Sequence, residues 1–157
     1  MNWIMTLFFL CLSPALLADN YQDYEQRLEV DSKQFISQIK SDGSFEYLLY
    51  LIEYGNQKAI QFTPKILAYS DAAMSEAIKL SLARAISRNP EAVMQLVPEN
   101  LSLTEVCNIP FIEAPDDIIN IHINQAISSL ISIDNTDINN QAKIETCLKQ
   151  FIRLKYR

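Results

Sequence analysis

The sequence predicts an all-α fold of seven or eight short helices, and two observations support this prediction. Only two glycines, Gly43 and Gly55, occur in 157 residues, which is too few for the positive-φ turns of a hairpin-rich β fold. Apolar residues instead recur at three- and four-residue steps, as they do along one side of an α-helix. With 49% hydrophobic residues the chain can build one core, so we expect residues 19–157 to form a single helical domain.

The clearest helical signals lie between Ser70 and Val97 and predict a helical hairpin. Ser70 or Asp71 can cap the start of its first helix. Asn89 is a favourable N-cap and Pro90 suits the first helical position, so a second helix begins with almost no loop between the two. The side of the first helix that faces the core is expected to consist of Met74, Ile78, Leu82, Ala85 and Ile86.

The other helices follow from apolar spacing, capping residues and one internal proline. Residues 19–40 form an amphipathic stretch that can break near Asp31. Ser44 is expected to cap a helix that Gly55 ends. Pro64 predicts a kink or a split in the helix that follows, because proline lacks the backbone N–H. Helices are expected at residues 45–54, 57–69, 102–107 and 116–133 and from about 136 onward, with an irregular loop at 108–115.

Antiparallel helix pairs with very short connections resemble the helical-repeat modules of HEAT or tetratricopeptide proteins. The resemblance covers about residues 45–97 and is architectural, since no sequence period establishes a repeat. It implies a stack of antiparallel helix pairs, and it brings no functional residues with it.

Residues 1–18 have the pattern of a secretory signal peptide. They contain no charged side chain, and an apolar run from Trp3 to Leu12 leads to small residues that end at Ala18. The run is too short to span a membrane comfortably. We therefore expect cleavage after Ala18, a periplasmic or secreted product and no stable membrane insertion afterwards. An uncleaved anchor or a buried first helix is the alternative.

Removal of residues 1–18 would leave two cysteines, Cys107 and Cys147. An even number of cysteines in an oxidising compartment predicts that they form a disulfide. Closing a loop of about 41 residues would stabilise the fold by about 4 kcal/mol on the chain-entropy model. Two buried free thiols are the alternative. Two cysteines and one distant histidine do not supply the four ligands of a zinc site.

The net charge disfavours two classes of partner. The chain has 13 basic and 19 acidic residues. Nucleic acids and anionic lipid surfaces are bound first by clustered lysines and arginines, so neither is an expected partner. The scarcity of glycine also excludes a Gly-rich phosphate loop, and no cofactor is expected.

Residues that could perform catalysis or bind a metal have simpler structural explanations. His122 is the sole histidine, and a helical wheel puts it beside Gln125 and Ser129 on a polar side, so we expect it to be solvated. Ser129 lies about 10 Å further along the helix axis, too far to form a nucleophile–base pair with it. Asp116 and Asp117 favour a helix N-terminus. No EF-hand spacing occurs, so no metal site is expected. Because these residues form no catalytic arrangement, an enzyme is not expected either.

A stripe of tyrosines is the first candidate surface for a partner. Tyr47, Tyr50 and Tyr54 recur at i, i+3 and i+7 on the helix expected at residues 45–54, and Tyr69 is a further candidate. Tyrosine combines apolar area with a hydroxyl group and is enriched at the centres of interfaces. The alternative is that these rings pack at the edge of the core beneath the N-terminal helix.

The loop after Cys107 is the second candidate surface. Two prolines and the expected disulfide would restrain it, which lowers the entropy cost of presenting side chains to a partner. The exposed residues would be Phe111, Ile112 and Glu113. The alternative is that Phe111 and Ile112 fill the core beneath the loop.

These expectations favour an exported, non-enzymatic protein-binding module, whose partner the sequence does not identify. A small inhibitor, such as an immunity protein against an envelope-acting toxin, and an adaptor of envelope assembly are both compatible with this class. The alternative is a carrier of a small apolar ligand between helices, which would use the same aromatic residues and a gap opened at Pro64.

Overall fold

The computed structural model describes residues 21–134 and 138–156, and within these ranges the chain is helical with no strand. The all-α prediction is therefore confirmed. One helix more than expected is present in this part, because residues 19–40 yield two helices that Asp31 separates. The helices are α1 (Tyr21–Val30), α2 (Ser32–Ser41), α3 (Ser44–Glu53), α4 (Gln57–Leu67), α5 (Ala72–Ala85), α6 (Pro90–Met94), α7 (Leu103–Val106), α8 (Asp116–Ile131) and α9 (Ile138–Lys155).

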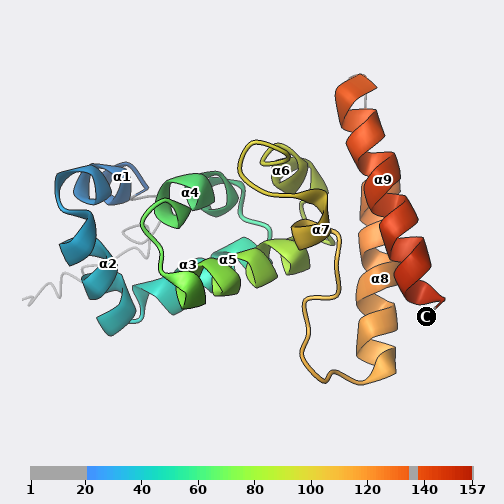
Figure 1. Cartoon of the computed structure of the whole chain (residues 1–157), viewed down its shortest axis with the longest axis horizontal. Helices are drawn as coiled ribbons and strands as arrows, with labels where there is room; N and C mark the ends of the chain where they lie inside the picture. The colour runs from blue at the N-terminus through green and yellow to red at the C-terminus, as the bar shows by residue number, and fades with distance from the viewer. Residues whose placement is uncertain (1–20, 135–137, 157) are drawn as a thin grey trace, which may run out of the picture.

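The helices form a two-layered stack that a C-terminal hairpin closes at one end. Figure 1 shows α1, α4 and α6 along one layer and α2, α3 and α5 along the other, with α8 and α9 standing upright beside the far end. Within the layers, α3 packs against α5 and α4 against both α1 and α6. Helices two or three apart in the chain thus become neighbours, as expected for a helical stack.

The hairpin of α5 and α6 forms as its capping residues predict. The Asp71 carboxylate accepts a hydrogen bond from the Met74 backbone N–H at 2.9 Å, and the Asn89 side chain accepts one from Ala92 at 3.2 Å. The Asn89 amide also donates to the Gly55 carbonyl at 2.9 Å, so the turn is tied to the end of α3. The five residues expected on the core side of α5 and its C-cap are buried: Met74, Ile78, Leu82, Ala85 and Ile86.

The cap expected at Ser44 and the split expected at Pro64 do not occur, each for a short-range reason. Ser44 is the first residue of α3 rather than its cap, since Gly43 adopts φ +81° there and Asp42 accepts the Ser44 N–H. Pro64 does not split α4. Its missing N–H would leave the Ile60 carbonyl without a partner, and the Thr63 hydroxyl donates to that carbonyl at 2.7 Å instead.

The C-terminal hairpin is fixed to the stack by a disulfide and by buried side chains. Cys107 and Cys147 are bonded, with Cα atoms 5.4 Å apart, which confirms the predicted pair. Phe151 of α9 is fully buried. The Ser129 hydroxyl donates to the Ser87 carbonyl at 2.6 Å, and the Lys143 ammonium donates to the Val97 carbonyl.

The predicted signal peptide at residues 1–18 and the expected helix start near Thr136 lie outside the described residues. None of the helices within residues 21–134 and 138–156 is long and apolar enough to cross a membrane.

The two glycines provide a matched test of how closely α3 and the α5–α6 turn approach each other. Both have positive φ, but a Cβ at Gly55 would lie 3.0 Å from the Arg88 Cβ, whereas one at Gly43 would meet nothing within 4 Å. We predict that Gly43→Ala lowers the free energy of unfolding by about 1 kcal/mol through backbone strain. Gly55→Ala should cost about 2 kcal/mol more because of overpacking. Urea unfolding of both variants measures this, and equal losses would contradict the close approach.

Candidate functional site

The tyrosine stripe lies on the solvent side of α3. Tyr47, Tyr50 and Tyr54 are 49%, 57% and 63% exposed, so the alternative, that these rings pack beneath the N-terminal helix, is wrong. The rings of Tyr47 and Tyr50 stack with centroids 6.4 Å apart, and those of Tyr50 and Tyr54 stack at 5.9 Å. This arrangement follows from helical spacing, since Phe45, Leu48 and Ile52 take the buried side of the helix.

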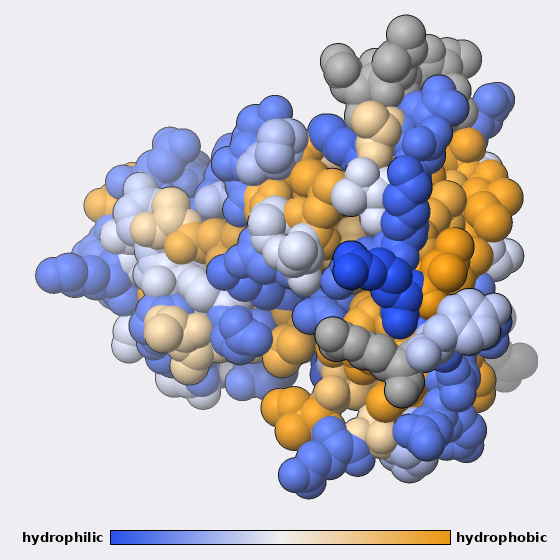
Figure 2. All heavy atoms as spheres, turned by 45° about the vertical axis from the view of Figure 1, so that its right-hand side comes forward, coloured by the Kyte–Doolittle hydropathy of each residue, from blue (hydrophilic) through white to orange (hydrophobic). Residues whose placement is uncertain are grey.

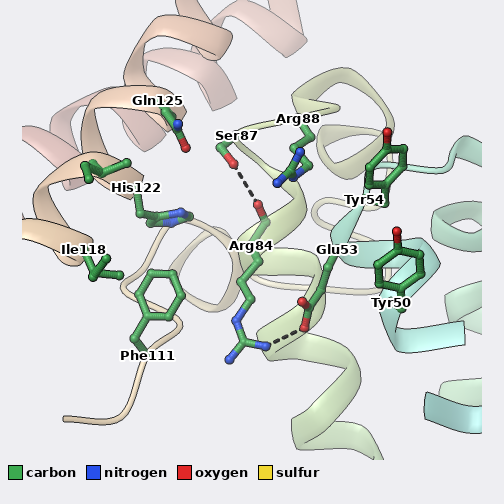
Figure 3. A pocket seen from close by; sticks show the side chains of 11 residues that line it. Tyr50, Glu53, Tyr54, Arg84, Ser87, Arg88, Phe111, Ile118, His122 and Gln125 are labelled. Carbon is green, nitrogen blue, oxygen red and sulfur yellow. Dashed lines mark hydrogen bonds and ion pairs between the residues drawn. The ribbon is translucent and has the colours of Figure 1, made fainter. Parts of the chain in front are cut away.

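A groove open to solvent separates the tyrosine stripe from α8. It has a volume of ≈ 270 Å³ and lies between α3 and α5 on one side and α8 with the 108–115 loop on the other. In Figure 3 the tyrosines stand opposite Phe111, Ile118 and His122, with the side chains of Arg84 and Glu53 between them. The groove is lined by Tyr50, Glu53, Tyr54, Arg84, Ser87, Arg88, Phe111, Ile118, Ile121, His122 and Gln125.

The two surfaces predicted from separate segments therefore meet in one place. Tyr50 and Tyr54 come from the stripe and Phe111 comes from the loop. Tyr47 does not line the groove, but it extends the aromatic surface from its rim through its stack on Tyr50. Tyr69 belongs elsewhere, in a hollow with Ile36 and Lys40.

The loop residues divide between the groove and solvent. Phe111 is half-buried and its ring meets that of His122 edge-on, with centroids 5.3 Å apart. Ile112 is 85% exposed, so it does not fill the core, and Glu113 is exposed with φ +53°. Ile109, earlier in the same loop, packs against the core instead.

Arg84 connects three parts of the groove. Its Nη1 lies 2.5 Å from Glu53 Oε1 on α3, and its Nη2 donates to the Pro110 carbonyl at 3.0 Å. Its Cζ lies 5.5 Å from the centre of the Phe111 ring, within cation–π range. The Ser81 hydroxyl also donates to Glu53 at 3.1 Å. One guanidinium thus holds the loop and its phenyl ring against α3 and α5.

Arg88 occupies the rim beside the tyrosines. It is exposed and lies in the turn after α5, with its Cζ 5.6 Å from the centre of the Tyr54 ring. Within the described part of the chain, no carboxylate or carbonyl accepts a hydrogen bond from its guanidinium. Its N–H donors are therefore turned to solvent at the edge of the groove.

The prediction that His122 is solvated was wrong. The side chain is only 5% exposed, and its ring lies between Phe111 and Phe151, 6.0 Å from the latter. The helical wheel considered only α8, whereas the covering residues come from the loop and from α9. Burial lowers the pKa of His122, although a backbone hydrogen bond with Asn108 acts in the opposite direction. Its Nε2 is buried without a hydrogen-bond partner.

The other residues considered for chemistry keep structural roles. The Ser129 hydroxyl bonds to the Ser87 carbonyl, and so it does not pair with His122. Asp116 and Asp117 lie in the first turn of α8, as expected. Across residues 21–134 and 138–156, no group of three or more histidine, cysteine, aspartate and glutamate side chains is placed to hold a metal ion.

The sequence did not identify several residues that line the groove. They lie on segments far apart in the chain, which only the fold brings together. Arg84 near the end of α5 and Arg88 in the turn after it are spaced i, i+4, and this was their only local signal. Glu53 had no local signal that it would pair with Arg84, which lies 31 residues later in the chain. Ile118 and Ile121 are exposed on α8 and are not among its buried residues.

Comparison with protein-family models, with curated proteins and with solved structures finds no match to this chain.

Burial of the sole histidine predicts a defined pH dependence of stability. Well above pH 6.5, the ordinary pKa of histidine, His122 is neutral in both the folded and the unfolded state. As the pH falls below this value the unfolded state binds the proton first, so the free energy of unfolding decreases. Urea unfolding at pH 7.5 and 5.5 measures the decrease, and His122→Leu should reduce it. A single imidazole NMR signal that titrates at 6.5 or above would contradict the account.

Proposed function

We propose that this protein is an exported, non-enzymatic protein-binding module whose binding surface is the groove together with the tyrosine stripe. The observation that carries the proposal is that Tyr50, Tyr54 and Phe111, from two segments far apart in the sequence, line one groove beside two arginines. Tyrosine and arginine are the residue types that dominate binding energy at protein interfaces. Their exposure on a folded scaffold supports this use.

Several contacts support a surface that is already ordered before it binds. The disulfide fixes the base of the loop, and Arg84 bonds to Pro110 within it. Three stacked tyrosines restrain one another on α3. Because these groups lose little freedom on binding, more of the interaction energy remains as affinity. Such a surface suits a small inhibitor, an immunity-type protein or an adaptor of envelope assembly.

Export is part of the proposal and has two supports. Residues 1–18 have the composition of a signal peptide. A disulfide between Cys107 and Cys147 is stable in an oxidising compartment such as the periplasm or the extracellular space.

The alternative function, a carrier of a small apolar ligand, finds less support in the groove. Ligand pockets of that kind enclose most of the ligand in apolar walls. Here the groove is open and includes Glu53, Arg84 and Arg88 among its lining residues. α4 also continues as one helix through Pro64, where a split could have opened a gap between helices. Native mass spectrometry distinguishes the two functions, because a carrier would retain extra mass.

Photo-crosslinking from the groove tests the proposed function. We predict that p-benzoylphenylalanine in place of Tyr50, in the exported protein in its own cells, gives a crosslink to one protein partner. The same replacement of Tyr69 is the matched control, because Tyr69 is also half exposed but lies in another hollow. Mass spectrometry identifies the crosslinked product.

A crosslink from position 50 that is absent from position 69 is the expected result. Addition of Phe111→Ala should then weaken the crosslink, because Phe111 forms the opposite wall of the groove. Equal crosslinking from both positions, or none from position 50, would contradict the proposal.

A further inference from the structure

The two arginines of the groove differ in how much of their bonding capacity is already used. Arg84 gives one terminal nitrogen to Glu53 and the other to the Pro110 carbonyl, and one face to Phe111. Its remaining nitrogen, Nε, is buried. Arg84 is therefore a positioning residue, which holds the loop in place and has little left to offer a ligand.

Arg88 is in the opposite situation. One face of its guanidinium lies over the Tyr54 ring, and no acceptor in the described ranges uses its N–H groups. The base of the side chain is also held, because its Cβ packs closely against Gly55. A planar guanidinium held by a ring at its face and free at its edge is suited to a carboxylate, which it can bind through two parallel hydrogen bonds.

Charge in the groove favours the same ligand chemistry. The whole chain has a net charge of −6. The residues that line the groove nevertheless include two arginines and one carboxylate, and that carboxylate, Glu53, is paired with Arg84. The positive charge of Arg88 thus remains uncompensated by any lining residue. A negative group entering at this rim meets an attractive charge on an otherwise acidic protein.

Apolar surface adjoins Arg88 on both sides of the groove. Tyr50 and Tyr54 form one wall, and Ile118 and Ile121, which are 43% and 51% exposed, belong to the other. Figure 2, which brings the C-terminal hairpin forward, shows apolar patches beside hydrophilic ridges around that hairpin. An apolar side chain next to the carboxylate would find contacts here.

We propose that the groove recognises a carboxylate of the partner protein, bound by Arg88, together with an adjacent apolar side chain that packs between the tyrosines and α8. The carboxylate belongs either to an aspartate or glutamate side chain or to the C-terminus of the partner. This inference rests on the proposed function, since it names the chemistry by which that same groove selects its partner.

Two pairs of short peptides test the inference on the full mature protein. The first pair is acetylated and amidated Leu-Phe-Asp against Leu-Phe-Asn, and the second is acetylated Leu-Phe with a free C-terminus against its amide. NMR titration should show that the carboxylate member of one pair binds on the order of tenfold more tightly than its neutral twin, as expected for charge-assisted hydrogen bonds. If the first pair differs in affinity, the groove recognises a side-chain carboxylate. If the second pair differs, it recognises a C-terminal carboxylate.

Matched variants assign this preference to Arg88. Arg88→Gln should abolish the difference between the peptides, whereas Arg153→Gln, which changes the net charge equally at an exposed site on α9, should preserve it. Retention of the difference in Arg88→Gln, or no difference in either pair for the unaltered protein, would overturn the inference. Circular dichroism of both variants verifies that they fold.

Crosslinking from position 50 separates failure of this inference from failure of the proposed function. If the partner still crosslinks with undiminished yield after Arg88→Gln, the carboxylate inference is overturned while protein binding stands. If the peptides discriminate through Arg88 but no partner crosslinks, the recognition chemistry is supported and the proposed function fails.

Discussion

The attachment of the C-terminal hairpin to the helical stack is the constraint on which the rest of the site depends. The groove has α3 and α5 as one wall and α8 with its preceding loop as the other, so it exists only where these parts meet. The Cys107–Cys147 bond holds them together covalently, and the hydrogen bond from Ser129 to Ser87 fixes α8 beside the turn after α5. Without this attachment Tyr50 and Phe111 would belong to unrelated surfaces.

The relative position of the two groove walls is also fixed by a few polar contacts of Arg84. Arg84 ties Glu53 on α3 to the Pro110 carbonyl of the loop, and the pair is partly exposed, so its net contribution to stability is small. Its importance is positional, since it sets the distance between the tyrosine stripe and Phe111. Arg88, four residues later, is left free by the same arrangement. The groove therefore combines one arginine that builds it with one that is available to a partner.

The sequence was sufficient for features that depend on neighbouring residues and insufficient for those that depend on distant ones. The caps at Asp71 and Asn89 act within three residues, and helical spacing correctly put Met74 and Ile78 in the core. The disulfide could be predicted because Cys107 and Cys147 are the two cysteines left once residues 1–18 are removed. His122 was wrongly expected to be solvated. The rings that bury it belong to Phe111 and Phe151, which lie 11 residues before it and 29 after it in the sequence. The groove itself, and the roles of its arginines, arise from the meeting of three segments that no local pattern connects.

The proposed function requires that the partner binds in the groove between the stack and the C-terminal hairpin. Amide hydrogen exchange of the mature protein, with and without the partner identified by crosslinking, tests it most directly. Slower exchange on binding is expected in the segments that form both walls, residues 47–55, 84–88 and 108–125. Protection confined to α1 and α2, at the opposite end of the stack in Figure 1, would contradict it.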